Sequence, residues 1–141
     1  MTVLAASRIR LEPTPVALRA IGGWLRQATA RLDADAAAAM LSRAELAVHE
    51  ACMNVIEHAG LPEGSEIDLE LELTTDRLTI RVSDAGDVFD LDAVADPAPH
   101  TLQEGGYGVK IIRSLVDELT YRRSNSMNEL ELRLNLGSTH A

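Results

Sequence analysis

The sequence has one cysteine, few aromatic residues and a shortage of positive charge, and each shortage excludes a class of protein. Aromatic residues make up 3% of the chain, and 13 Lys and Arg residues stand against 22 Asp and Glu residues, giving a net charge of −9. A chain with neither a basic surface nor aromatic stacking platforms is unsuited to bind nucleic acid directly. Cys52 has no second cysteine to pair with, so the sequence predicts a reducing compartment.

The sequence also lacks a membrane span, a signal peptide and a P-loop. No apolar run approaches the length of a spanning helix, and residues 1–11 have no apolar centre, so we expect a cytoplasmic protein that does not enter membranes. Lys110 is the only lysine, and no G-x-x-x-x-G-K-S/T motif contains it, which excludes a P-loop. With 46% apolar and 25% charged residues, residues 1–141 have the balance of one globular domain.

The pattern of apolar residues predicts an α+β fold with two layers, a mixed and mostly antiparallel sheet covered on one face by about three helices. Expected strands span residues 7–12, 67–73, 78–82, 119–123 and 130–136, the first of them at a sheet edge. One expected helix spans residues 16–32, a second runs from Asp33 or Asp35 to Ala59, and a third spans residues 109–116. The stretch from about 87 to 105 has little apolar periodicity, which at this length predicts a lid.

The helix expected to end at Ala59 carries two periodic series. One is an apolar stripe suited to a core, formed by Leu41, Ala44, Val48, Cys52, Val55 and Ala59. The other is a polar row of Glu50, Asn54 and His58, in which each residue lies about 40° around the helix from the last. A carboxylate, an amide and an imidazole beside a buried stripe point to a site, although many surface helices also place Glu and Asn four residues apart.

Two glycine motifs follow the polar row along the chain. Asp84-x-Gly86 ends an expected strand, where the glycine allows close approach of a ligand to the backbone. A cluster of three glycines then opens the helix expected after the lid, and its members are Gly105, Gly106 and Gly108. The free N–H groups and positive dipole end of a helix start attract phosphate. Each motif alone is common in turns, but the ordered set is more specific.

This ordered set resembles the N, G1 and G2 boxes of the GHKL ATPase superfamily. Within the superfamily, three segments are similar to those of the bacterial anti-sigma factor serine/threonine kinases: L-A-V-H-E-A-C-M-N-V-I-E-H-A, V-S-D-A-G-D-V-F-D and G-Y-G-V-K-I-I-R-S-L-V-D-E-L-T-Y. The resemblance covers nearly the whole chain, from the first strand to Leu136. It implies a histidine-kinase-like, or Bergerat, ATP-binding fold with ATP and Mg²⁺ as cofactors.

The resemblance implies a role for each matching residue. Asn54 would hold Mg²⁺ that bridges the ATP phosphates, and Asp84 would accept a hydrogen bond from the adenine amino group. Gly86 would let the base approach, and the glycine cluster would cradle the phosphates. Glu50 would act as general base on an attacking serine hydroxyl. His58 belongs to the same row, with either a supporting role at the cofactor or a structural one.

The resemblance also implies partners. Proteins of this family form homodimers, bind a sigma factor and phosphorylate an anti-sigma factor antagonist of the STAS type, which is partner-switching regulation. Val88 stands where the family's G1 box often has a second glycine, so an ATP-dependent binding switch with weak or no phosphate transfer stays open.

Two other functions share some of these features. The ATP-binding domain of a sensor histidine kinase would need a phosphoacceptor hairpin, for which the residues before Glu50 leave no room. A non-enzymatic interaction module is disfavoured by the three motifs, though Val88 keeps it open.

Overall fold

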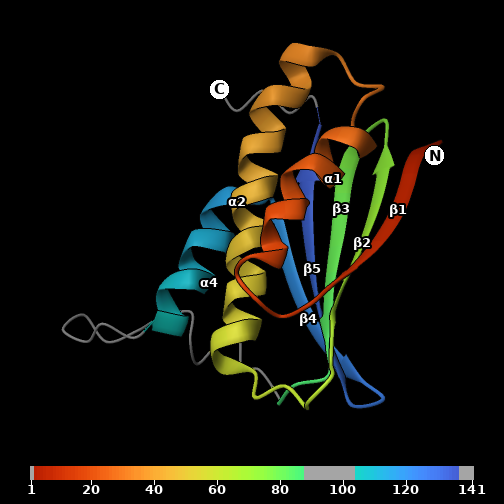
Figure 1. Ribbon diagram of the computed structural model, residues 1–141. Coiled ribbons are helices and arrows are strands. Elements are labelled where there is room, and N and C mark those ends of the chain that lie inside the picture. The colour runs from red at the N-terminus through yellow and green to blue at the C-terminus, as the bar shows by residue number, and fades with distance from the viewer. Residues whose placement is uncertain (1, 88–103, 137–141) are drawn as a thin grey trace.

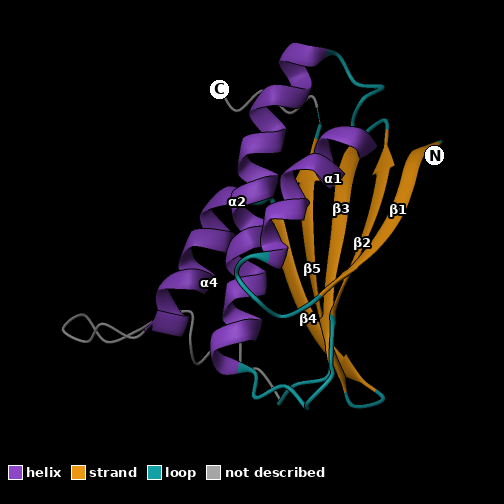
Figure 2. Ribbon diagram, viewed as in Figure 1, coloured by secondary structure: helices purple, strands orange, loops and turns teal. Residues whose placement is uncertain are grey.

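The structure is a computed structural model that describes residues 2–87 and 104–136. Helices cover one face of a five-stranded sheet, which confirms the two-layer α+β fold (Figures 1 and 2). In chain order, the elements are β1 (Val3–Leu11), the 3-10 helix η1 (Ala17–Arg19), α1 (Ala20–Ala28), α2 (Ala34–His58), β2 (Ile67–Thr74), β3 (Arg77–Asp84), α4 (Glu104–Leu115), β4 (Glu118–Ser124) and β5 (Met127–Asn135). Most of the expected lid, including Val88, lies outside the described residues.

The strands follow the order β1-β2-β3-β5-β4, and every neighbouring pair among them is antiparallel. The described sheet is therefore more uniform than the mixed, mostly antiparallel sheet expected. Asn125 and Ser126 have φ angles of 53° and 63°, as a two-residue hairpin turn between β4 and β5 requires. Because β5 pairs with β3 as well as β4, its register places Asn128 opposite Asp84.

The core lies between the sheet and the helical layer. The inward-facing residues of β2 and β3 are buried. They are Ile67, Leu69, Leu71, Leu73, Leu78, Ile80 and Val82. From the stripe predicted on α2, Ala44, Val48 and Cys52 are fully buried against them. Burial away from water, with a smaller contribution from the charge of Asp84, raises the pKa of the Cys52 thiol to about 12. Cys52 is thus a neutral core residue.

Several boundaries differ from those expected. The helix expected over 16–32 is divided into η1 and α1, and it ends where Thr29 bonds its own side chain to the Leu25 carbonyl, Oγ1 to O 2.8 Å. A threonine that bonds back in this way competes with helix continuation. β1 is an edge strand, as predicted, but it begins at Val3 because β2 supplies partners as far as Thr74. α4 begins at Glu104, so the glycine cluster lies inside its first turns.

Polar side chains on the outer face of the sheet form ion pairs from strand to strand. Arg81 on β3 contacts Glu131 on β5 at 3.0 Å, and Arg133 also contacts Glu131. Partial burial works against ionisation of Glu131, but the two arginines outweigh it and lower the pKa of its carboxyl. No helix within residues 2–87 and 104–136 is long and apolar enough to cross a membrane.

Candidate functional site

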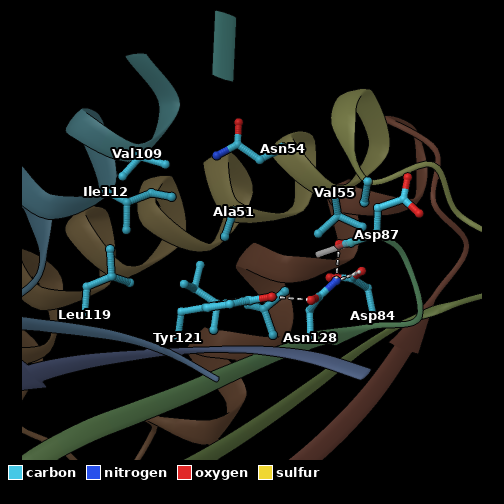
Figure 3. A pocket seen from close by; sticks show the side chains of 13 residues that line it. Ala51, Asn54, Val55, Asp84, Asp87, Val109, Ile112, Leu119, Tyr121 and Asn128 are labelled. Atoms are coloured by element: carbon cyan, nitrogen blue, oxygen red, sulfur yellow. Dashed lines mark hydrogen bonds between the residues drawn. The ribbon is translucent and has the colours of Figure 1, made fainter. Parts of the chain in front are cut away.

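A pocket lies between α2 and the sheet, where β3 ends and β5 begins (Figure 3). Its walls come from α2, α4 and the three strands β3, β5 and β4, and they are mostly apolar. The lining residues are Ala51, Asn54, Val55, Ala59, Val82, Asp84, Asp87, Val109, Ile112, Leu119, Tyr121, Asn128 and Leu130. A largely apolar pocket with a few convergent polar groups is the usual form of a small-molecule site.

Asp84 is the buried carboxylate of this pocket, with 5% of its surface exposed. Its Oδ1 atom accepts two hydrogen bonds, from the Gly86 backbone N–H at 2.8 Å and from Asn128 Nδ2 at 3.0 Å. Its Oδ2 atom receives no hydrogen bond from another described residue. The carboxylate is therefore held through one oxygen, and the other can accept from a ligand that carries an N–H group.

Gly86 is required at this point by the contact of the chain with itself. A Cβ atom on Gly86 would lie 2.5 Å from the Ala59 carbonyl oxygen and 2.6 Å from the Ala59 Cβ. The next residue, Asp87, donates its backbone N–H to the same carbonyl at 2.6 Å. The turn after β3 is thus fastened to the end of α2, a reason for the glycine that the sequence did not reveal.

The polar row on α2 is only partly brought to the pocket. Asn54 is among the lining residues, but its side chain extends from the helix away from Asp84 and Asn128, and no hydrogen bond joins it to another labelled residue (Figure 3). Glu50 lies one turn earlier, is half-buried, and is not among the lining residues. The side chain of His58 lies outside the described part of the structure.

The glycine cluster lies in the first turns of α4. The first α4 residue that lines the pocket is Val109, which follows Gly108. The first four N–H groups of a helix have no partner within it; Gly105 and Gly106 lie in that first turn of α4, whereas Gly108 follows it. Across residues 2–87 and 104–136, no group of three or more His, Cys, Asp or Glu side chains could hold a metal ion.

Tyr121 and Asn128 line the pocket, but sequence reasoning missed both. Asn128 is 4% exposed and occupies the first inward position of β5, where the following inward positions are Leu130, Leu132 and Leu134. One amide at the start of a leucine row is a signal that the sequence does carry. It was missed because the expected strand began at Leu130. Tyr121 donates its hydroxyl hydrogen to Asn128 Oδ1 at 2.5 Å.

Known proteins resemble this chain in sequence and in fold. A family model described as the histidine kinase-like ATPase domain matches residues 11–134. The serine-protein kinase RsbW of Halalkalibacterium halodurans is 34% identical over 91 residues, which are 59% of this chain and 56% of that protein. The RsbW of Bacillus velezensis is 37% identical over 91 residues, 58% of this chain and 56% of that protein. The chain thus spans little more than half the length of these relatives.

One solved structure supports the fold. A crystal structure of the RsbU and RsbW domains of a Mycobacterium tuberculosis protein superposes with a TM-score of 0.67 at 20% identity, covering 93% of this chain and 32% of that one. At this identity the likeness concerns the fold alone. Because the family model covers most of the chain, from the end of β1 to β5, the protein belongs to the histidine kinase-like ATPase domain family.

Proposed function

We propose that residues 1–141 form one ATP-binding domain that uses Mg²⁺ and transfers the γ-phosphate of ATP to a serine of a partner protein. The observation that carries this proposal is Asp84, a buried carboxylate at the end of an apolar pocket with one oxygen free to accept. The family to which the chain belongs supports ATP as the ligand.

The base end of the pocket has the chemistry that adenine requires. The free oxygen of Asp84 suits the 6-amino group, which is a donor, and would oppose the 6-oxo group of guanine, which is an acceptor. Val55, Val82 and Leu130 supply apolar walls for the flat base. A site built around a donor of the ligand rejects analogues that lack it, because its own polar group is then left unpaired.

The phosphate end has Asn54 on α2 and the start of α4. Mg²⁺ prefers oxygen ligands and commonly takes only one or two from the protein, so a single amide oxygen from Asn54 fits it. When bound, the ion neutralises charge on the phosphates. The glycine cluster would bring backbone N–H groups to the same phosphates, as helix starts do.

Glu50 is the proposed general base for a serine hydroxyl that a docked protein delivers. Phosphate transfer depends mainly on positioning and charge neutralisation, so a base contributes roughly 10²–10⁴-fold. Glu50 does not line the pocket. The same observation favours a second candidate, in which ATP binding switches partner affinity with weak or no transfer.

The proposed partners are a sigma factor and a STAS-type antagonist, the proposed assembly is a homodimer, and the proposed location is the cytoplasm. The relatives named serine-protein kinase support the reaction class. Mixing the protein with radiolabelled ATP and a panel of STAS antagonists should give a labelled serine. If wild type binds ATP but labels none of them, the binding switch is the better description.

Calorimetric titration with ATP and Mg²⁺ tests the site itself. Asp84→Asn keeps an oxygen for the Gly86 N–H but turns an amide donor toward the adenine amino group, itself a donor, so ATP affinity should fall about tenfold or more without unfolding. Asn54→Ala should lower affinity for Mg²⁺–ATP but leave affinity for adenosine unchanged, because adenosine has no phosphate. Wild-type affinity in both folded variants would show that the site has been misassigned.

A further inference from the structure

Asn128 is a buried amide whose every polar atom is used. Nδ2 donates to Asp84 Oδ1 at 3.0 Å and to the Asp87 carbonyl at 2.8 Å, with a longer contact of 3.3 Å to the Gly86 carbonyl. Oδ1 accepts from the Tyr121 hydroxyl at 2.5 Å and from Arg123 Nη1 at 2.9 Å. An amide has two donor hydrogens and two acceptor lone pairs, so none is left over for a ligand.

These partners allow one orientation of the Asn128 amide. Arg123 can only donate, and the Asp87 carbonyl and an ionised Asp84 can only accept. A flipped amide would face donor to donor and acceptor to acceptor, which at 4% exposure no water could relieve. Arg123 on one side and the Asp87 carbonyl and Asp84 on the other therefore determine which way Asn128 points, and the Tyr121 hydroxyl adds a hydrogen bond to the oriented Oδ1 atom.

The orientation of Asn128 decides which part of Asp84 a ligand meets. Asn128 and the Gly86 N–H together occupy Oδ1 of Asp84, leaving Oδ2 without a partner among the described residues. Asn128 Nδ2 also donates to the Asp87 carbonyl, while the Asp87 N–H donates to the carbonyl of Ala59, the residue directly after α2. The Asp84 carboxylate and the turn at Gly86 and Asp87 are thus held in place by contacts from β5, from β4 through Asn128, and from the end of α2 through Ala59.

We propose that Asn128 is the positioning residue for base recognition, oriented by Arg123 and the Asp87 carbonyl and supported by Tyr121, and that it acts through Asp84 without touching the nucleotide. The inference rests on the proposed binding of ATP. Its consequence is that preference for a 6-amino purine over a 6-oxo purine depends on Asn128 even though Asp84 supplies the contact.

The test compares ATP with inosine triphosphate, which carries an oxygen in place of the 6-amino group. Wild type should prefer ATP. Asn128→Leu continues the leucine row of β5 but removes the restraint on Asp84, so ATP affinity should fall about tenfold or more, as for one lost hydrogen bond to a charged group. Affinity for inosine triphosphate should change less than about twofold, which lowers the preference ratio.

Three further variants separate positioning from general support of the fold. Asn128→Thr keeps a hydroxyl that can donate to Asp84 and accept from Tyr121, so it should restore part of the preference. In an Asp84→Asn background, Asn128→Leu should leave the preference ratio unchanged, because the residue it acts through is already altered. The double variant Tyr121→Phe with Arg123→Gln should lower the ratio as Asn128→Leu does.

Matched controls lie on the same two strands. Asn135→Leu makes the same change at the exposed far end of β5, and Arg122→Gln removes an outward-facing charge beside Arg123. Both should keep the wild-type preference. Equal losses of ATP and inosine triphosphate in Asn128→Leu would reduce Asn128 to a structural role and overturn the inference while the proposed function stands. Absence of ATP binding by wild type would overturn both.

Discussion

Replacing Gly86 with alanine tests whether this glycine serves the fold or only the ligand. Positive φ angles among the described glycines occur at Gly60 and Gly64, so alanine meets no backbone restriction at 86. Its Cβ would instead lie 2.5 Å from the Ala59 carbonyl oxygen, 2.6 Å from the Ala59 Cβ and 2.9 Å from Asp84 Oδ1. Two of these atoms belong to Ala59, directly after α2, so the end of that helix would have to move away.

The expected cost of Gly86→Ala follows from those contacts. Overpacking of a tight site costs about 1–3 kcal/mol. Movement of α2 would also weaken the bond from the Asp87 N–H to the Ala59 carbonyl, worth about 1 kcal/mol. A loss of about 3 kcal/mol corresponds to a fall in Tm of roughly 10 °C for a domain of this size.

Thermal unfolding without nucleotide, followed by circular dichroism, measures this loss directly. Gly64→Ala is the matched control: no atom lies within 4 Å of its Cβ position, and only its φ of +81° opposes alanine, at a cost of about 1 kcal/mol. Adding Ala59→Gly to Gly86→Ala should restore part of the stability, because it removes the Cβ contact but leaves the carbonyl. A Tm for Gly86→Ala within about 1 °C of wild type would refute this reasoning.

Three further predictions follow from the charges, the site and the sheet edge. The pKa of the Glu131 carboxyl is lowered in the folded state, so Glu131 stabilises the fold at pH values above its unfolded pKa. This contribution is lost as pH falls through the folded pKa. Glu131→Gln should therefore lower the free energy of unfolding in urea by about 1 kcal/mol at pH 7, and by progressively less in acid. Glu50→Gln should retain ATP affinity by calorimetry but lose roughly 10²–10⁴-fold in phosphate transfer, and transfer at the wild-type rate would place the base elsewhere. Light scattering should give about twice the chain mass of 15.2 kDa, with β1 as a free edge for contact, and a monomer at micromolar concentration would contradict the dimer.

Periodicity along the sequence was sufficient for the elements and for part of the site. Strict alternation in β2 and β3 and the apolar stripe of α2 are local patterns, and each marks the face that is buried. Asn54 and Asp84 could be predicted because each sits in a short motif of its own segment. Both line the same pocket in the structure, whereas Glu50, predicted from the same helix row, does not line it.

The rest of the site depends on which strands become neighbours, and this is not a local property. Asn128 reaches Asp84 across 44 positions of sequence only because β5 inserts between β3 and β4. The contact between Gly86 and Ala59 likewise depends on how the end of α2 meets the turn after β3. Neither spacing nor composition specifies such pairings, so a motif can name Asp84 without naming what holds it.

This dependence links the base end of the pocket to the hairpin between β4 and β5. Asn128 is the second residue of β5, two positions after the turn residue Ser126. Tyr121 and Arg123, which donate to its Oδ1 atom, lie on the other strand of the same hairpin. If β5 were shifted by one residue relative to β3 and β4, Asn128 would face the outer side of the sheet and a neighbouring residue would lie opposite Asp84 on the inner side. The tight turn, with two non-glycine residues at positive φ, holds the register in place. The hairpin therefore determines the position of the amide that we propose acts in recognition of the base.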